Sequence, residues 1–166
     1  MKKSKRSLTV FLSVLVLAIL LLNSRPRTLE SILGLKTETL TGMAADCVIG
    51  DVRNGKPVHD VYMLSRLKPE DASFTALLSA MESTRYCASP ANLSPFPRSS
   101  AGGNGSSVSV SLTLAAGEKY ASFTFLTPRK LSLDLSGKDT LLVYFLTDDT
   151  AFSTMQRYLM ENGTIK

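Results

Sequence analysis

The chain has 166 residues, of which 44% are hydrophobic and 20% charged, a balance typical of a single domain that can bury a core. This composition excludes a chain that is disordered along its whole length. The formal net charge of +5 comes from the first 27 residues, which hold six basic and no acidic side chains, whereas the remainder holds 13 basic and 14 acidic ones. The charge therefore gives no reason to expect a nucleic-acid partner. Two Cys, one His and no Trp exclude a disulfide-rich scaffold and a Cys/His zinc module, so we predict neither a metal nor a cofactor.

The N-terminal segment is typical of a signal that targets a chain for export. A basic start is followed by fifteen residues, 8–22, of which only two are polar. The stretch that follows lacks a pair of small residues for cleavage, because bulky Leu22 lies two residues before Ser24, and no Cys follows for a lipoprotein anchor. We therefore predict an uncleaved signal anchor in residues 1–27, with residues 8–22 in the membrane. A cleaved signal, which would give a secreted protein, and a helix buried in a soluble chain are the alternatives.

The basic residues around the apolar run predict its orientation. Four of them precede the run and two follow it, namely Lys2, Lys3, Lys5 and Arg6, then Arg25 and Arg27. Because Lys and Arg flanking a membrane span tend to stay in the cytoplasm, we expect the N-terminus inside and the rest of the chain outside the cell membrane. The sequence thus predicts a single-pass protein with an extracytoplasmic domain.

Two segments are predicted to connect rather than to fold. Residues 28–43 carry Leu29, Ile32 and Leu33 at helical spacing, which predicts a short juxtamembrane helix or a stalk. Residues 88–107 are rich in Pro, Gly and Ser and hold few large apolar side chains, so we expect a flexible loop there.

Residues 44–166 show the strand and helix patterns of one domain. Six runs rich in apolar and β-branched residues predict strands, at 46–52, 57–64, 108–114, 120–125, 131–135 and 140–146. The first two runs flank Asn54-Gly55, the strongest short signal for a hairpin turn. Two helices are predicted from apolar residues on one face: Phe74, Leu77, Leu78 and Met81 after Pro69, and Phe152, Met155 and Leu159 after Asp148.

This order of elements predicts an α+β fold, with an antiparallel sheet of about six strands and two helices on one face. Two blocks of the sequence share a pattern, in which a hairpin closes on Gly-Lys, its second strand carries Val-Tyr-x-Leu, and an Asp stands three residues before a helix Phe. One interpretation is that the domain consists of two ββα-type units, and the other is chance similarity.

Three residues match the order of the catalytic groups in a known class of anchored enzymes. His59, Cys87 and Arg98 follow one another as in the sortase transpeptidases, to which the chain is also similar in having an N-terminal anchor. The resemblance implies Cys87 as thiolate nucleophile, His59 as acid and base, and Arg98 as the group that holds the oxyanion. The residues just before Cys87 lack the Thr-Leu-x-Thr-Cys signature of sortases, which leaves such an enzyme as the alternative function.

The two cysteines have a second interpretation as a disulfide. Outside the cytoplasm thiols oxidise, and a helix that returns over its own hairpin would bring Cys47 and Cys87 near one another. Closing a loop of about 40 residues would stabilise the fold by roughly 3 to 4 kcal/mol in the chain-entropy description. Two buried free thiols are the alternative.

The leading prediction of function is a binding or interaction module outside the membrane, for a protein or envelope ligand that the sequence does not identify. It rests on the anchor and on the lack of a recognisable catalytic set, so we lean away from an enzyme. The expected contact surfaces are the edge of the sheet, where unpaired backbone groups accept another strand, and the loop around Phe96 and Arg98.

Residues 106–162 show a run of alternating strand, Gly-Glu-Lys-Tyr turn, Phe-Thr-Phe strand, hairpin and final helix. In this pattern the chain resembles small uncharacterised domains that follow a signal or anchor in Gram-positive bacteria. The resemblance implies a location and a fold class, and it brings no activity with it.

Overall fold

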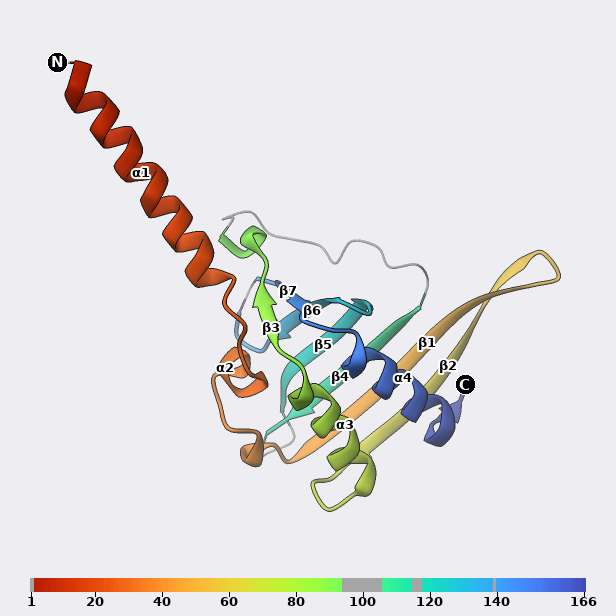
Figure 1. Ribbon diagram of the computed structural model, residues 1–166. Helices are drawn as coiled ribbons and strands as arrows, with labels where there is room; N and C mark the ends of the chain where they lie inside the picture. Colours follow the sequence, from red (N-terminus) through yellow and green to blue (C-terminus); the bar gives the residue numbers. More distant parts are fainter. Residues whose placement is uncertain (1, 94–105, 115–117, 139) are drawn as a thin grey trace.

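The computed structural model describes residues 2–93, 106–114, 118–138 and 140–166. In these residues the chain forms one antiparallel sheet of eight strands and four α-helices, which confirms the predicted α+β class (Figure 1). The helices are α1 (Lys2–Asn23), α2 (Leu29–Leu33), α3 (Ala72–Ser83) and α4 (Thr150–Asn162), with short 3₁₀ turns η1 (Thr37–Thr39) and η2 (Pro90–Leu93). The strands are β1 (Gly42–Arg53), β2 (Lys56–Leu67), β3 (Tyr86–Ala88), β4 (Ser107–Thr113), β5 (Lys119–Thr127), β6 (Lys130–Leu135), β7 (Leu142–Leu146) and β8 (Thr164–Ile165).

The strand order across the sheet is β3-β7-β6-β5-β4-β1-β2-β8. The six predicted strands are all present, as β1, β2 and β4 to β7. The sequence did not predict β3 and β8, which follow the two domain helices and lie at the two edges of the sheet. Each of them is only two or three residues long, too short to show a strand period.

Alternation of side chains builds the two faces of the sheet. On β4, Val108, Val110 and Leu112 are fully buried, whereas the serines between them are half-buried on the opposite face. The same period continues on β5, where Phe123 and Phe125 lie in register with Val110 and Val108. One face of the sheet therefore forms the core and the other is polar.

Helices α3 and α4 lie side by side on the apolar face of the sheet (Figure 1). Both present a buried stripe at helical spacing, made of Phe74, Leu77, Ala80 and Met81 on α3 and of Ala151, Phe152, Met155 and Leu159 on α4. The two predicted helices are thus confirmed, as are their predicted core residues except Leu78, which is only partly buried. The core lies between this helical layer and the sheet.

Residues 28–43 belong to the folded domain, so the stalk predicted there is wrong. The side chains of Leu29, Ile32 and Leu33 on α2 are buried in the core. Two hydrogen bonds fix the helix, one at its start, from the N–H of Ser31 to Oγ1 of Thr28 (3.3 Å), and one at its end, from the hydroxyl of Tyr120 to the carbonyl of Leu33 (2.7 Å). The helical spacing of the apolar residues predicted the helix. The sequence did not predict that these residues would be buried in the core.

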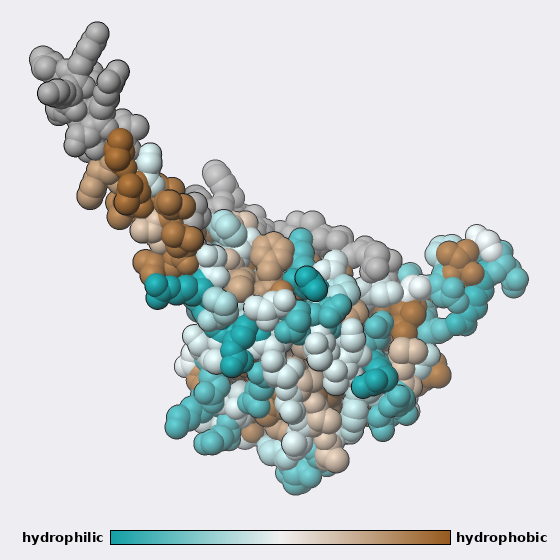
Figure 2. Space-filling view, in the orientation of Figure 1, coloured by the Kyte–Doolittle hydropathy of each residue, from teal (hydrophilic) through white to brown (hydrophobic). Residues whose placement is uncertain are grey.

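Helix α1 extends away from the domain (Figure 1). Its large apolar side chains that the structure describes, ten between Val10 and Leu22, are 44 to 65% exposed. Figure 2 shows them as a hydrophobic surface that continues along the helix. Over the described part of the chain, no helix combines the length and the hydropathy that crossing a membrane requires.

The first part of the loop predicted at 88–107 is ordered. Ala88 belongs to β3, and Ser89 is buried. The side chain of Asn92 bonds the backbone of Val143 twice, with Nδ2 donating to its carbonyl (2.7 Å) and Oδ1 accepting from its N–H (2.9 Å). Residues 94–105 lie outside the described part of the chain.

The same order of elements occurs twice along the chain. β1, β2, α3 and β3 follow one another in the first part, and β6, β7, α4 and β8 do so in the second. The last strand of each part pairs antiparallel with the second strand of the other, β3 with β7 and β8 with β2. β4 and β5 lie side by side at the centre of the sheet, between the two parts.

Candidate functional site

The structure separates the two cysteines that were expected to form a bridge. Cys47 lies on β1 and Cys87 on the edge strand β3, and four strands stand between these two in the sheet. Five strand spacings amount to about 24 Å, whereas a disulfide needs Cα atoms within about 7 Å. Both cysteines are free, so the disulfide is not formed. The strand that follows helix α3 is β3, and it lies at the far edge of the sheet rather than beside the β1–β2 hairpin that precedes the helix.

The predicted Cys/His pair is not assembled either. His59 lies on β2 near one edge of the sheet and Cys87 on β3 at the other edge. Arg98, the third group of this hypothesis, lies outside the described residues, as does Phe96 of the expected binding loop. Burial raises the pKa of the Cys47 thiol to about 11, which keeps this second cysteine in the unreactive thiol form.

Part of each sheet edge is covered by a short segment of the same chain. At the β3 edge, Arg27 and Tyr86 form an antiparallel bridge. At the other edge, β8 pairs with Tyr62 and Met63 of β2. These contacts leave less of each sheet edge free to pair with a strand from a partner, the contact that the sequence predicted.

A small open pocket lies where the chain enters the domain. Its volume is about 230 Å³, and Glu30 and Glu82 supply its acidic groups. Both carboxylates bond Thr37: Glu30 Oε1 accepts from its N–H (3.1 Å), and Glu82 Oε1 accepts from its hydroxyl (2.8 Å). The two acids therefore serve to hold the turn at Thr37 against the domain.

The hairpin of β1 and β2 extends beyond the rest of the sheet as a two-stranded arm, residues 49–60 (Figure 1). β4 pairs with β1 only as far as Val48, so beyond this point β1 and β2 pair with each other. Asn54 and Gly55 form the turn, both with positive φ (55° and 74°), which confirms the hairpin predicted from this dipeptide.

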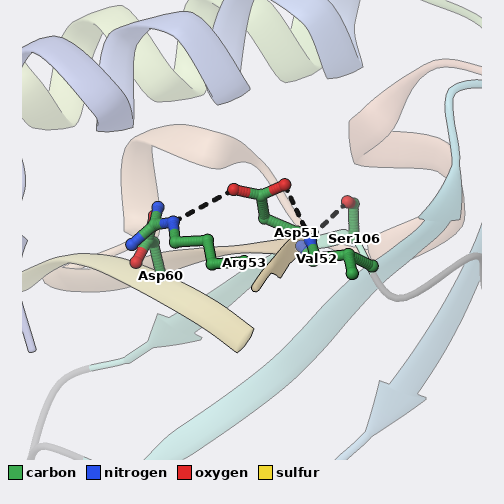
Figure 3. Close-up of polar contacts among 6 residues, drawn as sticks. Asp51, Val52, Arg53, Asp60 and Ser106 are labelled. Atoms are coloured by element: carbon green, nitrogen blue, oxygen red, sulfur yellow. Dashed lines mark hydrogen bonds and ion pairs between the residues drawn. The ribbon is translucent and has the colours of Figure 1, made fainter. Parts of the chain in front are cut away.

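Side chains satisfy the backbone donors on the β1 side of the arm (Figure 3). The pairing of Arg53 with Lys56 closes the hairpin, so the N–H groups of Val52 and Gly50 point away from β2. The first donates to Oδ1 of Asp51 (2.7 Å) and the second to Oγ of Ser106 (3.2 Å).

An ion pair network crosses the same arm. The Arg53 guanidinium bonds Oδ2 of Asp51 (3.1 Å) and the carboxylate of Asp60 on the neighbouring strand (Figure 3). The hydrogen bond from the N–H of Val52, followed by the contact with Arg53, lowers the pKa of the Asp51 carboxyl below its ordinary value. Both contacts favour the charged form of Asp51.

The arm has one charged and one uncharged side. Strand alternation places its four charged residues, Asp51, Arg53, Lys56 and Asp60, on the same side as the helices. The opposite side carries Val52, Pro57 and His59, and it continues onto the sheet with Val48 and Val61. Val52 is 68% exposed, the largest value among the described large apolar side chains beyond α1, equalled by Ile165.

Sequence reasoning identified the arm as a hairpin but missed it as a candidate site. The alternation of polar and apolar residues in 49–60 is the same as in a strand inside a sheet, so the sequence did not show where the neighbouring strand ends. Length was no signal either, because the predicted runs 46–52 and 57–64 are only one or two residues longer than their counterparts, 131–135 and 140–146.

No protein family, curated protein or solved structure matches the chain. The resemblance of residues 106–162 to anchored domains of Gram-positive bacteria therefore stays a prediction.

Proposed function

We propose that the chain is a single-pass, membrane-anchored interaction module, with α1 in the bilayer and the α+β domain at the outer membrane surface. The observation that carries this proposal is the exposure of the apolar side chains of α1, none of the described ones being buried. Exposed apolar surface of this extent is unfavourable in water, at roughly 25 cal/mol for each Å². Lipid tails along the helix would remove this surface from water.

The length of the apolar run fits a bilayer with help from its flanks. Fifteen helical residues rise about 22 Å, which is shorter than the roughly 30 Å of a typical hydrocarbon core. The sequence places Lys5 and Arg6 before the run and Arg25 after it. Long basic side chains reach from within the hydrocarbon to the headgroups, and the bilayer thins locally around a short span.

The connection between α1 and the domain is short. Three residues, 24–26, separate the end of α1 from Arg27, whose backbone is paired with Tyr86. Three residues span at most about 10 Å when fully extended. In the folded protein this stretch is too short to reach far from the domain surface, and it would hold the domain close to the lipid headgroups.

The role of the domain as an interaction module is supported by the arm, residues 49–60. The arm presents an uncharged surface, and on the other side Arg53 forms ion pairs with Asp51 and Asp60. The competing enzyme hypothesis has lost its geometric support, since Cys87 and His59 lie near opposite edges of the sheet.

The proposal is tested by flotation of the full chain with lipid vesicles after extraction at alkaline pH. We expect the wild type to float and Leu15→Arg to remain at the bottom, because a charge at the centre of a bilayer costs about 3 kcal/mol. Thr75→Arg adds the same charge to an exposed position of α3 and is the matched control, expected to float. Release of the wild type from vesicles by alkaline extraction would contradict the anchor.

Orientation is tested on intact cells with a tag at the C-terminus. The basic residues before the apolar run predict an outer domain, so added protease should remove the tag while the cells stay closed. A protected tag would contradict the proposed orientation, and a mature chain that has lost α1 would contradict the uncleaved anchor.

A further inference from the structure

The arm is the clearest difference between the two parts of the chain that share the order strand, strand, helix, strand. Its strands β1 and β2 have 12 residues each, whereas β6 and β7 have six and five. Every residue of β6 pairs with β5, while five residues of β1 extend past the last one that pairs with β4. The second part shows that the fold does not need such an extension, which indicates a role for the arm outside the sheet.

We propose that the uncharged side of the arm binds the same surface on a second copy of the chain. This surface consists of Val52, Pro57 and His59, with Val48 and Val61 at the base of the arm. Two copies related by a two-fold axis would cover the exposed face of Val52 in both.

The charges of the arm favour an identical partner. Asp51, Arg53, Lys56 and Asp60 sum to zero, and all four lie on the side away from the proposed contact. The Arg53 guanidinium already bonds both acids. An arm with a net charge would repel its own copy, whereas this one brings no like-charged pair into the contact.

The backbone of the arm determines how the copies meet. On the β1 edge, the outward N–H groups of Gly50 and Val52 bond Ser106 and Asp51. On the β2 edge, Pro57 has no N–H to donate. These edges are poor templates for another strand, so we infer that the copies pack through side chains rather than by extending one sheet.

The membrane favours the same contact, and this step rests on the proposed function. The short connection of residues 24–26 would hold every copy at one height above the bilayer, so that all arms lie at the same level. A surface this small buries less than the roughly 800 Å² per partner of a stable soluble complex. Confinement to a membrane raises the local concentration enough for a weak contact to form.

The test is cysteine crosslinking of the full chain in phosphatidylcholine vesicles at low protein density, with Cys87→Ser to remove the half-buried native thiol and Cys47 left buried. We expect Val52→Cys to form a disulfide-linked dimer about tenfold faster than Thr75→Cys, a control at another exposed position, on α3. Val48→Asp, introduced into the Val52→Cys chain, places a charge on the proposed contact surface. This change should abolish the difference in crosslinking rate between positions 52 and 75.

Equal crosslinking rates at positions 52 and 75 in vesicles would overturn the proposal. The same would follow if Val52→Cys in membranes of expressing cells formed an adduct with a different protein in place of the dimer. Flotation of each sample separates the two claims: a chain that floats but does not crosslink refutes the arm contact alone. A chain that crosslinks at position 52 in micelles but does not float refutes the anchor alone.

Discussion

Arg27 and Tyr86 exchange two backbone hydrogen bonds, each 3.0 Å from nitrogen to oxygen. The bridge joins the segment that follows α1 to the edge strand β3. Tyr86 is fully buried, and its hydroxyl donates to the carbonyl of Met81 (2.7 Å) near the end of α3. The entry of the chain is thereby fixed to the core of the domain.

Removing the Tyr86 hydroxyl should destabilise the domain. Tyr86→Phe leaves the buried carbonyl of Met81 without this donor, and we expect a loss of about 1 to 3 kcal/mol in the free energy of unfolding. Denaturant titration of the full chain measures it. Tyr120→Phe removes a half-buried hydroxyl that bonds Leu33, and its effect should be smaller. A Tyr86→Phe chain as stable as the wild type would contradict the role of this bond.

Asp46 should make stability depend on pH. Burial on the β1 strand raises the pKa of its carboxyl, with a partly opposing hydrogen bond from Ser109. Because the folded pKa lies above the unfolded value of 3.8, the favourable contribution is complete below pH 3.8 and is lost as the pH rises through the folded pKa.

Asp46→Asn should therefore raise the free energy of unfolding at pH 7 and have little effect below pH 3.8. Unfolding midpoints measured between pH 3 and pH 7 give the comparison. Asp134→Asn, at an exposed position of the β6 strand, is the control. A gain that grows toward acidic pH would show that the sign is wrong.

Gly163 should tolerate no side chain. It has an ordinary backbone conformation (φ −80°), but a Cβ atom there would come within 2.5 Å of the Leu159 carbonyl oxygen and 3.0 Å of the Met63 nitrogen. Gly163→Ala should displace β8 from β2 and lower stability by about 1 to 3 kcal/mol, as overpacking does. Thermal unfolding measures the loss, with Glu161→Ala on the exposed side of α4 as control. Equal melting temperatures for the two variants would contradict this prediction.

The arm should open independently of the domain. Arg53→Met removes both of its ion pairs, yet these lie at the surface, so we expect the global free energy of unfolding to change little. Amide hydrogen exchange in residues 50–60 should become faster, while exchange in β5 stays the same. Lys68→Met is the matched control for losing a surface charge pair. Exchange that speeds up equally in β5 would show that the arm is not a separate unit.

The sequence predicted the elements with long periodic patterns and missed those made by distant contacts. Alternation on β4 and the helical stripe from Phe74 to Met81 identified their elements because each buries one face. β3 and β8 gave no such signal, since they are defined by pairing with β7 and β2. The predicted approach of Cys47 to Cys87 failed for the same reason, because strand order is decided by the whole sheet.

Placement of α1 in the bilayer is the central claim, and spin labelling tests it most directly. A nitroxide attached to Val14→Cys in the Cys87→Ser full chain on vesicles reports access of oxygen, which concentrates in lipid, and of a nickel chelate, which stays in water. We predict high oxygen access and low nickel access at position 14, and the reverse at Ser24→Cys, next to the domain. Nickel access at position 14 as high as at position 24 would contradict the account.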